Sequence, residues 1–259
     1  MSKIAFIYPG QGAQKCGMGA DFYENSASVR KLFDEAGEQL GLDMKALCFE
    51  ENNLLDQTEY TQAAMVTTCL AMTEVLMERG VKPDITAGLS LGEYCAIAEA
   101  GAMELLDAIR LVRVRGQLMQ HTVPTGEGAM AAVLGMDADQ IDAVIKPIAN
   151  VTVANYNCPG QIVITGGTAG IEQASKTLKE AGAKRAVSLN VSGPFHSPML
   201  RSAGEKLGKE LSAVQLGELK IPYVTNVTAE YVTDSSEIRE LLTRQVYSPV
   251  RWEQSIRKM

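Results

Sequence analysis

The motif Gly88-Leu89-Ser90-Leu91-Gly92 decides how this chain is interpreted, both as a fold and as chemistry. Pro83–Ala87 before it is typical of the end of a strand, and Glu93–Ala98 after it is typical of a helix. A G-x-S-x-G motif in that context predicts a nucleophile elbow, where two glycines permit a sharp turn that exposes a serine hydroxyl. Backbone N–H groups at the helix start can stabilise an oxyanion. A tight turn with an incidental serine is the alternative, and five residues alone do not decide between them.

Strands and helices alternate on either side of this motif. Lys3–Tyr8 predicts a short apolar strand that runs into the turn Pro9-Gly10-Gln11-Gly12. Helical patterns are found at about 26–40, 61–80 and 104–121. This alternation predicts an α/β fold with a mostly parallel sheet and helices on its faces.

The pattern changes after Pro124-Thr125-Gly126. Six elements follow in the order strand, helix, strand, strand, helix, strand: Ala129–Leu134, Ala138–Ala149, Val151–Asn155, Gln161–Thr165, Ala169–Ala181 and Ala186–Val191. This order is that of the split βαβ, or ferredoxin-like, unit. We therefore expect a small subdomain at 125–192, inserted into a larger discontinuous domain at 1–124 and 193–259.

The composition excludes several classes of protein. The 259 residues are 46% hydrophobic and 21% charged, which is ordinary for a globular protein, and the net charge of −7 argues against a general nucleic-acid binder. No apolar run is long enough to span a membrane, and the N-terminus enters a strand pattern without a secretory signal. Five widely spaced cysteines without a C-x-x-C pair indicate free thiols in the cytoplasm, with neither a disulfide framework nor a metal site.

Only two histidines can serve as a general base for a serine nucleophile. His196 is the better candidate, because its proline-braced loop Ser192–Pro198 joins the inserted unit to the next helix, and domain junctions are usual places for ligand clefts. His121 ends a helix, where a histidine interacts favourably with the helix C-terminus. The alternative for His196 is a structural histidine that hydrogen-bonds a carbonyl.

Arg115 is an unusual charge on the predicted 104–121 helix. Its neighbours at helical spacing are all apolar: Leu111, Val112, Leu118 and Met119. A buried guanidinium must be paired, and the same helix offers no acid at the right spacing. Either a distant protein carboxylate or a ligand carboxylate therefore pairs with it, and arginine suits a carboxylate because its planar fork binds both oxygens.

No acid between Ser90 and His196 lies at the end of a predicted core strand, where a triad acid belongs. A backbone carbonyl could orient the histidine instead, which would leave a milder base than a full triad. The Tyr8–Gly12 turn lies at a strand end, where ligands bind in open α/β sheets, so Gln11 could offer its backbone N–H to an oxyanion. A simple strand-to-loop turn is the alternative.

Five motifs resemble, in order and spacing over nearly the whole chain, those of bacterial malonyl-CoA:acyl carrier protein transacylases: Tyr8–Gly12, Gly88–Glu93, Val114–Gln117, Asn155–Gln161 and Pro194–Ser197. The resemblance implies an α/β-hydrolase-like core with an inserted ferredoxin-like subdomain. It also implies transfer of a malonyl group from malonyl-CoA to the phosphopantetheine thiol of acyl carrier protein, with no bound cofactor or metal.

The resemblance implies a role for seven residues. Ser90 is similar to the nucleophile that becomes malonylated, His196 to its general acid and base, and Arg115 to the clamp on the free malonyl carboxylate.

The four remaining positions surround these groups. The backbone N–H groups of Gln11 and Leu91 match the oxyanion hole, and Gln245 matches the position whose carbonyl orients the histidine. Phe195 resembles the malonyl-preferring form of the family, in contrast to the methylmalonyl-preferring form.

Two features depart from the family pattern. Leu89 stands where the family usually has histidine, so we expect altered packing near the site more than lost activity. Family members generally continue past the Trp252 region with a strand, a glycine-rich turn and a closing helix. A local basic patch for the carrier is expected at Lys184 and Arg185, with solvated helix-end charges as the alternative.

Two other functions compete with this interpretation. A serine thioesterase or other hydrolase would release free acid, but Arg115 and the missing triad acid argue against it. A non-catalytic scaffold with the same fold would not be acylated at Ser90.

Overall fold

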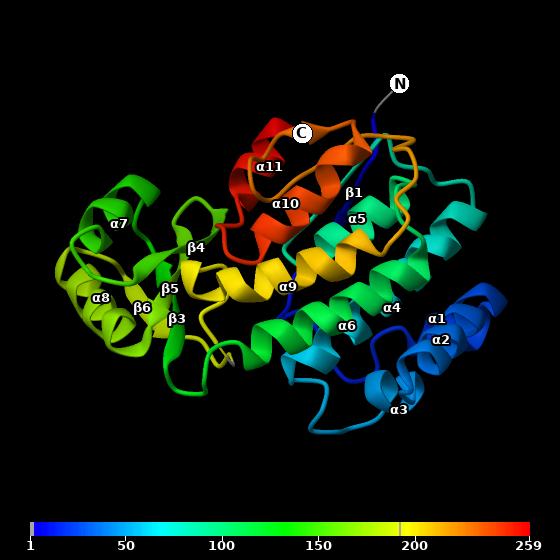
Figure 1. The fold of residues 1–259 in the computed structure, drawn as a ribbon, viewed down its shortest axis with the longest axis horizontal. Helices are drawn as coiled ribbons and strands as arrows, with labels where there is room; N and C mark the ends of the chain where they lie inside the picture. The colour runs from blue at the N-terminus through cyan, green and yellow to red at the C-terminus, as the bar shows by residue number, and fades with distance from the viewer. Residues whose placement is uncertain (1–2, 192) are drawn as a thin grey trace. The chain divides into compact units, whose positions relative to one another are not determined.

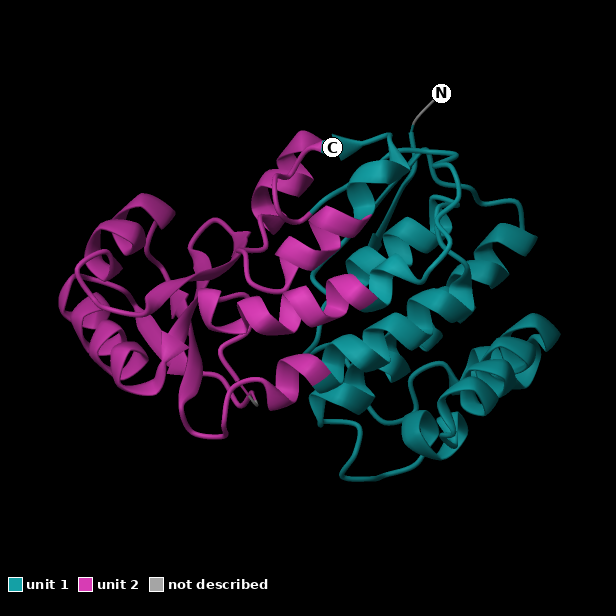
Figure 2. Cartoon of the chain, in the orientation of Figure 1, with its two compact units in different colours: residues 1–117, 210–225, 231–238 teal, residues 118–209, 226–230, 239–259 magenta. Residues whose placement is uncertain are grey.

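The computed structural model describes residues 3–191 and 193–259 (Figure 1). The chain divides into two compact units (Figure 2). Unit 1 comprises residues 1–117, 210–225 and 231–238, and unit 2 comprises residues 118–209, 226–230 and 239–259. Within the described residues, no helix combines the length and the apolar character needed to cross a membrane.

The sheet of unit 1 brings the Gln11 turn and the serine motif to the same edge. Its strands are β1 (Ala5–Tyr8), β2 (Ile85–Gly88), β7 (Tyr223–Val224) and β8 (Tyr231–Val232), in the order β1-β2-β7-β8. The pairs β1–β2 and β2–β7 are parallel, and β7–β8 is antiparallel. Because Tyr8 pairs with Gly88, the chain leaves β1 and β2 at the same level. This is the edge at which α/β proteins place their ligands.

The helices of unit 1 are α1 (Ala20–Asn25), α2 (Ala27–Leu40), α3 (Met44–Phe49), α4 (Thr58–Glu78), α5 (Gly92–Glu99) and most of α6 (Leu105–His121). Of these, α5 packs on β1 and β2, α4 packs on α5, and α2 and α3 pack on α4. The three predicted helices correspond to α2, α4 and α6, with ends that shift by at most three residues. The buried residues of α4 lie on all of its sides, as expected of a helix that packs between α2, α3 and α5. Any polar side chain that α4 carries inward therefore needs a partner.

Unit 2 contains a second sheet, in which every strand pair is antiparallel. Its strands are β3 (Gly128–Leu134), β4 (Val151–Cys158), β5 (Gln161–Gly167) and β6 (Arg185–Ser188), in the order β4-β5-β3-β6. The helices α7 (Ala138–Ile145) and α8 (Thr168–Glu180) alternate with them, in the predicted element order.

Several element ends in unit 2 differ from the sequence prediction. The strand predicted at Ala186–Val191 runs from Arg185 to Ser188, and the strand predicted at Gln161–Thr165 extends to Gly167. The helix predicted at Ala138–Ala149 ends at Ile145, because Pro147 cannot continue the hydrogen-bond ladder. The strand predicted at Val151–Asn155 extends to Cys158, with register shifts that allow it to pass Asn155 and Tyr156.

The C-terminal part of unit 2 contains a 3-10 turn η1 (Pro198–Leu200), α9 (Arg201–Ser212, shared with unit 1), α10 (Ile238–Gln245) and α11 (Trp252–Lys258). A short 3-10 turn η2 (Ser235–Glu237) precedes α10. The link between α10 and α11 pairs with β4, since Tyr156 N donates to Val250 O at 2.9 Å and Val250 N donates to Ala154 O at 2.8 Å. These bonds fix α10, which contributes to the site below.

Candidate active site

Ser90 lies on a tight, strained turn between β2 and α5, as the motif predicts. Its φ of 55° is in the left-handed region, which non-glycine residues adopt at functional or strained positions. Gly92 N donates to Leu89 O at 3.0 Å, and Glu93 N donates to Ser90 O at 3.1 Å, so the turn passes directly into α5. The Ser90 side chain therefore stands at the helix head, 9% exposed.

Both glycines of the motif are required by close backbone contacts. A Cβ at Gly88 would lie 2.0 Å from the carbonyl carbon of Gly92, and a Cβ at Gly92 would lie 2.6 Å from the Tyr8 carbonyl oxygen. Backbone cannot yield at those distances as a side chain could. The turn is therefore pressed against the end of β1.

Leu91 and Gln11 come from the two backbone segments that meet at this edge. Leu91 is fully buried at the N-cap of α5, and the Gln11 side chain donates from Nε2 to Thr58 Oγ1 at 3.1 Å. Leu89 N donates to Tyr8 O at 3.0 Å, which ties the two segments together. Leu89, which departs from the family pattern, packs on the turn after β1: a Cβ at Gly10 would lie 2.4 Å from its Cδ2.

Arg115 is buried, as its apolar neighbours predict, with only 1% of its surface exposed. Its Nη2 donates to Ser90 Oγ at 2.9 Å, and its Nη1 donates to Gln62 Oε1 at 2.7 Å. A guanidinium from α6 therefore touches the hydroxyl of the elbow directly. Both of these acceptors are neutral oxygens, so a carboxylate would bind the same nitrogens more strongly.

Burial and the neighbouring side chains shift the pKa of Arg115 in opposite directions. Burial lowers the pKa of the guanidinium, whereas Tyr94 and Glu93 raise it. Glu93 is itself fully buried on α5, and the Tyr94 ring centroid lies 5.8 Å from Arg115 Cζ. Because a guanidinium does not lose its proton in proteins, the group stays cationic at neutral pH.

Gln62 is a functional candidate that the sequence reasoning missed. It lies on α4 with 1% of its surface exposed, and its amide oxygen holds Arg115. A glutamine on a helix that is buried on all sides must be hydrogen-bonded. That argument would have singled it out had α4 been recognised as a wholly buried helix.

His196 lies in unit 2, in a buried loop held by its own hydrogen bonds. It is 4% exposed, has a φ of 58°, and its Nδ1 lies 2.8 Å from Gln245 O at the end of α10. A carbonyl only accepts, so Nδ1 carries the proton and Nε2 keeps its lone pair. The Gln245 amide in turn lies 3.4 Å from Asn226 Oδ1. The ring is thus oriented by a backbone carbonyl through its Nδ1.

Phe195 and the adjacent loop residues are tightly packed within unit 2. Phe195 is 6% exposed, its N donates to Gly193 O at 3.0 Å, and Ser197 Oγ donates to Pro194 O at 2.7 Å. A Cβ at Gly128 would lie 2.3 Å from Pro194 Cδ, so this loop is pressed against β3. Ser192, the first residue of the predicted loop, lies outside the described residues.

The candidate residues form two sets. Gln11, Ser90, Leu91 and Arg115 lie in unit 1 together with Gln62, and Phe195, His196 and Gln245 lie in unit 2. His121 is exposed at the last residue of α6. Among the described residues, no group of three or more His, Cys, Asp and Glu side chains is placed to hold a metal ion.

Comparison with known proteins first defines a class. The acyl transferase domain family matches residues 5–259, so this chain has the fold and the serine motif of an acyl transferase domain. Solved structures agree on the mixed α/β architecture with parallel and antiparallel sheets.

The relatives then define the family. Malonyl CoA-acyl carrier protein transacylase of Bacillus subtilis is 48% identical over all of this chain and 83% of its own length, and that of Staphylococcus aureus is 40% identical over 97% and 83%. The Clostridium perfringens transacylase structure superposes with a TM-score of 0.96 at 44% identity, covering 100% of this chain and 83% of that one. A malonyl-transacylase solved in complex with a type II polyketide acyl carrier protein gives 0.95 at 40%, covering 99% and 84%. This chain belongs to the malonyl-CoA:acyl carrier protein transacylases.

Proposed function

We propose that this chain transfers a malonyl group from malonyl-CoA to the phosphopantetheine thiol of acyl carrier protein, through a malonyl ester on Ser90. One observation carries the proposal: a buried guanidinium, that of Arg115, donates to the hydroxyl of a nucleophile elbow at 2.9 Å. A short acyl group on that oxygen places its own far end beside the same guanidinium. The acyl group that suits this site is one with a free carboxylate.

Arg115 supplies the selectivity in this proposal. The malonyl carboxylate is separated from the reacting carbonyl by one methylene, so it reaches the arginine while the carbonyl stays at Ser90. Arg115 Nη2 then donates to the carboxylate oxygens of the malonyl group as well as, or in place of, the neutral Ser90 hydroxyl. Such charge-assisted hydrogen bonds are about twice as strong as hydrogen bonds between neutral groups. An acetyl group offers the guanidinium no carboxylate.

The first half of the reaction forms the ester. His196 Nε2 removes the Ser90 proton, and Oγ attacks the thioester carbonyl while the Gln11 and Leu91 backbone N–H groups stabilise the oxyanion. The C–S bond breaks, and His196 returns the proton to the departing coenzyme A thiolate. The Gln245 carbonyl supports this role because it holds the proton on Nδ1 throughout.

The second half reverses these steps with a different thiol. His196 takes the proton of the carrier thiol, the sulfur attacks the ester carbonyl, and the C–O bond to Ser90 breaks. Ser90 recovers its proton from His196. The reaction therefore needs no bound cofactor or metal, because the proton returns to its starting point in each cycle. Phe195, packed beside His196, narrows the acyl site toward malonyl and against its methylated homologue.

The finer description of the fold belongs to the same proposal. The nucleophile between β2 and α5 supports an α/β-hydrolase-like core, assigned to residues 1–124 and 193–259. The sheet order β4-β5-β3-β6, with α7 and α8 as crossovers, supports a ferredoxin-like subdomain at 125–192. Five free cysteines support a reducing compartment, the cytoplasm.

Intact-mass measurement after brief exposure to malonyl-CoA tests the function. We expect the mass of one malonyl group on the wild-type chain and none on the Ser90→Ala variant. Addition of holo carrier protein should then move the group to the carrier. Free malonate as the main product would indicate a hydrolase, and no Ser90-dependent mass gain would indicate a scaffold.

A further inference from the structure

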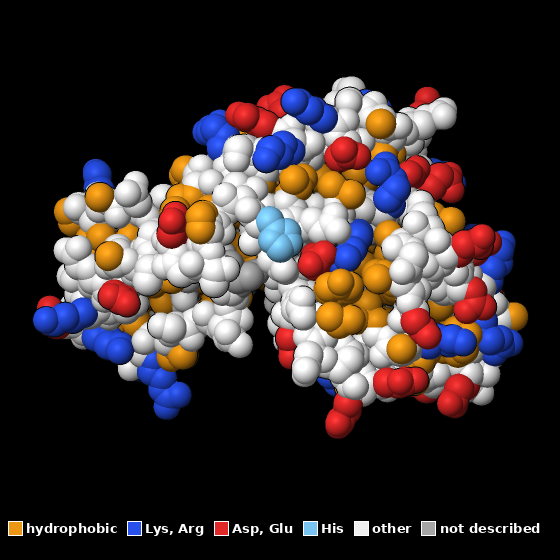
Figure 3. All heavy atoms as spheres, turned by 60° about the horizontal axis from the view of Figure 1, so that its bottom comes forward, with side chains coloured by type: hydrophobic (Ala, Val, Ile, Leu, Met, Phe, Trp, Pro, Cys, Tyr) orange, Lys and Arg blue, Asp and Glu red, His pale blue; other side chains and the backbone are white. Residues whose placement is uncertain are grey.

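The net negative charge of the chain is confined to one of its two units. Unit 1 has 11 Lys and Arg against 21 Asp and Glu, a net charge of −10, and unit 2 has 13 against 10, a net charge of +3. In Figure 3, Lys and Arg side chains gather at the end of unit 2 where Figure 1 places α8 and β6. An overall acidic chain therefore presents a basic unit, and an anionic partner is attracted to that unit.

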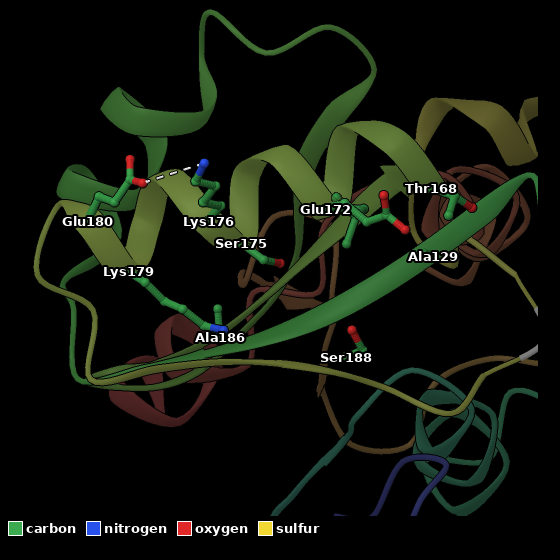
Figure 4. Close-up of a pocket in the computed structure, with 10 residues that line it drawn as sticks. Ala129, Thr168, Glu172, Ser175, Lys176, Lys179, Glu180, Ala186 and Ser188 are labelled. Carbon is green, nitrogen blue, oxygen red and sulfur yellow. Dashed lines mark ion pairs between the residues drawn. The ribbon is translucent and has the colours of Figure 1, made fainter.

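The groove between α8 and β6 does not account for the excess positive charge. Figure 4 shows its charged side chains, Lys176 and Lys179 with Glu172 and Glu180, all on α8. Lys176 Nζ lies 4.0 Å from Glu180 Oε1, and the two lysines balance the two glutamates. The groove is therefore close to neutral.

Two further cations of unit 2, Lys184 and Arg185, lie beside the groove where β6 begins. Both side chains are exposed, and neither forms an ion pair with any described residue. The stem of Lys184 packs over a glycine, since a Cβ at Gly135 would lie 2.6 Å from its Cγ and Cδ. Its ammonium group is thus supported on the protein surface and available to a partner.

The same strand adds apolar surface next to Arg185, whereas Lys184 lies just before the strand, over Gly135. Ala186 and Ser188 face the groove under α8, so Arg185 and Val187 point to the opposite face of the sheet. Val187 is 46% exposed, and Leu189, which continues the pairing by donating to Met130 O at 2.9 Å, is 37% exposed. Among the strands that the structure describes, β6 pairs with β3 alone and lies at the edge of the sheet.

We propose that Lys184, Arg185, Val187 and Leu189, here called the β6 strip, dock the acyl carrier protein. The proposal rests on the function proposed above. Every carrier that bears a phosphopantetheine arm has an anionic phosphodiester where the arm joins the protein. The two cations meet that anionic face, and the two apolar side chains cover nonpolar atoms of the carrier or its arm.

The position of the strip along the chain supports this assignment. The segment that forms β6 continues through Leu189 to Phe195 and His196 within the same unit. The carrier thiol must reach His196, which removes its proton in the second half-reaction. Repulsion by the net charge of unit 1 directs an anionic carrier toward the same unit.

A pair of charge reversals separates this docking from general electrostatics. The test variant is Lys184→Glu/Arg185→Glu, and its matched control is Lys31→Glu/Lys82→Glu, which changes the net charge equally at exposed positions of unit 1. Three rates are measured: kcat/KM for holo carrier protein, kcat/KM for free pantetheine as acceptor, and malonylation of Ser90 by malonyl-CoA.

We expect the test variant to lose about tenfold or more in kcat/KM for the carrier, with pantetheine and Ser90 malonylation within about twofold of wild type. The control should stay within about twofold in all three. Should the test variant fold poorly by its melting temperature, Lys184→Gln/Arg185→Gln replaces it, with a smaller loss in the same direction. Val187→Ser should lower only the carrier value.

Three results would overturn the β6 strip. These are an unchanged carrier value, an equal loss in the control, and an equal loss in malonylation by malonyl-CoA, which would assign the strip to coenzyme A phosphates. Failure of the wild-type enzyme to malonylate Ser90 or to pass the group to pantetheine would instead refute the proposed function.

Discussion

Ser90 and His196 both have a positive φ, 55° and 58°, but different parts of the structure hold them there. Ser90 is fixed by its own motif, because Gly88 and Gly92 allow backbone contacts that no side chain could fit. His196 is fixed by distant residues, chiefly the Gln245 carbonyl 49 positions further on. The Ser90 turn is therefore a property of local sequence, whereas the placement of His196 is a property of tertiary structure.

Gly88→Ala should have the largest effect, because it disrupts the local backbone contacts that hold the Ser90 turn. The new Cβ would meet the Gly92 backbone at 2.0 Å, so we expect the free energy of unfolding to fall by about 3 kcal/mol or more. Denaturant unfolding measures this. Gly167→Ala is the control, since its Cβ would lie 3.9 Å from the nearest atom. Equal stability of both variants would show that the elbow is not held by this contact.

His196→Ala should damage the chemistry while sparing the fold. Loss of a general base slows Ser90 malonylation by about 10²- to 10⁴-fold, and added imidazole should restore part of the rate. Single-turnover mass spectrometry measures the rate, and the melting temperature reports on the fold. An unchanged rate would exclude His196 as the base.

Arg115→Met should abolish acyl selectivity. We expect the ratio of kcat/KM for malonyl-CoA to that for acetyl-CoA to fall by about 100-fold, because the variant cannot pair a carboxylate. Arg113→Met is the matched control on the same helix, where the arginine pairs with Glu59 at 2.9 Å. A ratio that survives Arg115→Met, or falls equally in the control, contradicts the clamp.

Gln62→Leu tests a contact that supports the clamp. Removing the acceptor 2.7 Å from Arg115 Nη1 should lower kcat/KM for malonyl-CoA by about tenfold and leave the acetyl-CoA value nearly unchanged. Gln117→Leu on the surface of α6 serves as the control. Parallel losses for both acyl groups would mean that Gln62 supports the fold and not the selectivity.

Glu99→Gln should have the smallest effect, at the far end of the nucleophile helix. Burial and, to a smaller extent, Glu74 raise the pKa of the Glu99 carboxyl to about 7, with Lys220 opposing the rise. Because the folded pKa exceeds the unfolded value, stability falls as pH rises from about 4.5 to 7. The variant should therefore be more stable at pH 8 by about 1 kcal/mol, a figure reduced for partial exposure, and equal to wild type near pH 4. An unchanged pH dependence of the melting temperature would contradict this.

What the sequence predicts follows the same division between local and distant causes. The motif Gly88–Gly92 predicts its own turn, and the apolar neighbours of Arg115 predict its burial. Both predictions depend on residues only a few positions apart. Pro147 ends α7 early for a reason that is also local, and attention to it would have corrected the predicted end.

Distant causes left no comparable signal. Gln62 meets Arg115 only after α4 and α6 pack together, 53 positions apart in sequence, and nothing near Gln62 indicates that partner. Gln245 was assigned through family resemblance. Every residue has a backbone carbonyl, so the residue type gives no sign of which carbonyl accepts the bond from the histidine. The β6 strip depended on knowing which faces of β6 stay uncovered.

The Leu89 side chain couples positions 89 and 10, which are far apart in the sequence. Its Cδ2 occupies the space where any side chain at position 10 would begin. A side chain at position 10 would therefore require the flexible end of Leu89 to shift, so a redesign of the turn after β1 has to treat positions 10 and 89 together. Screens that vary either position alone will miss the combinations that work.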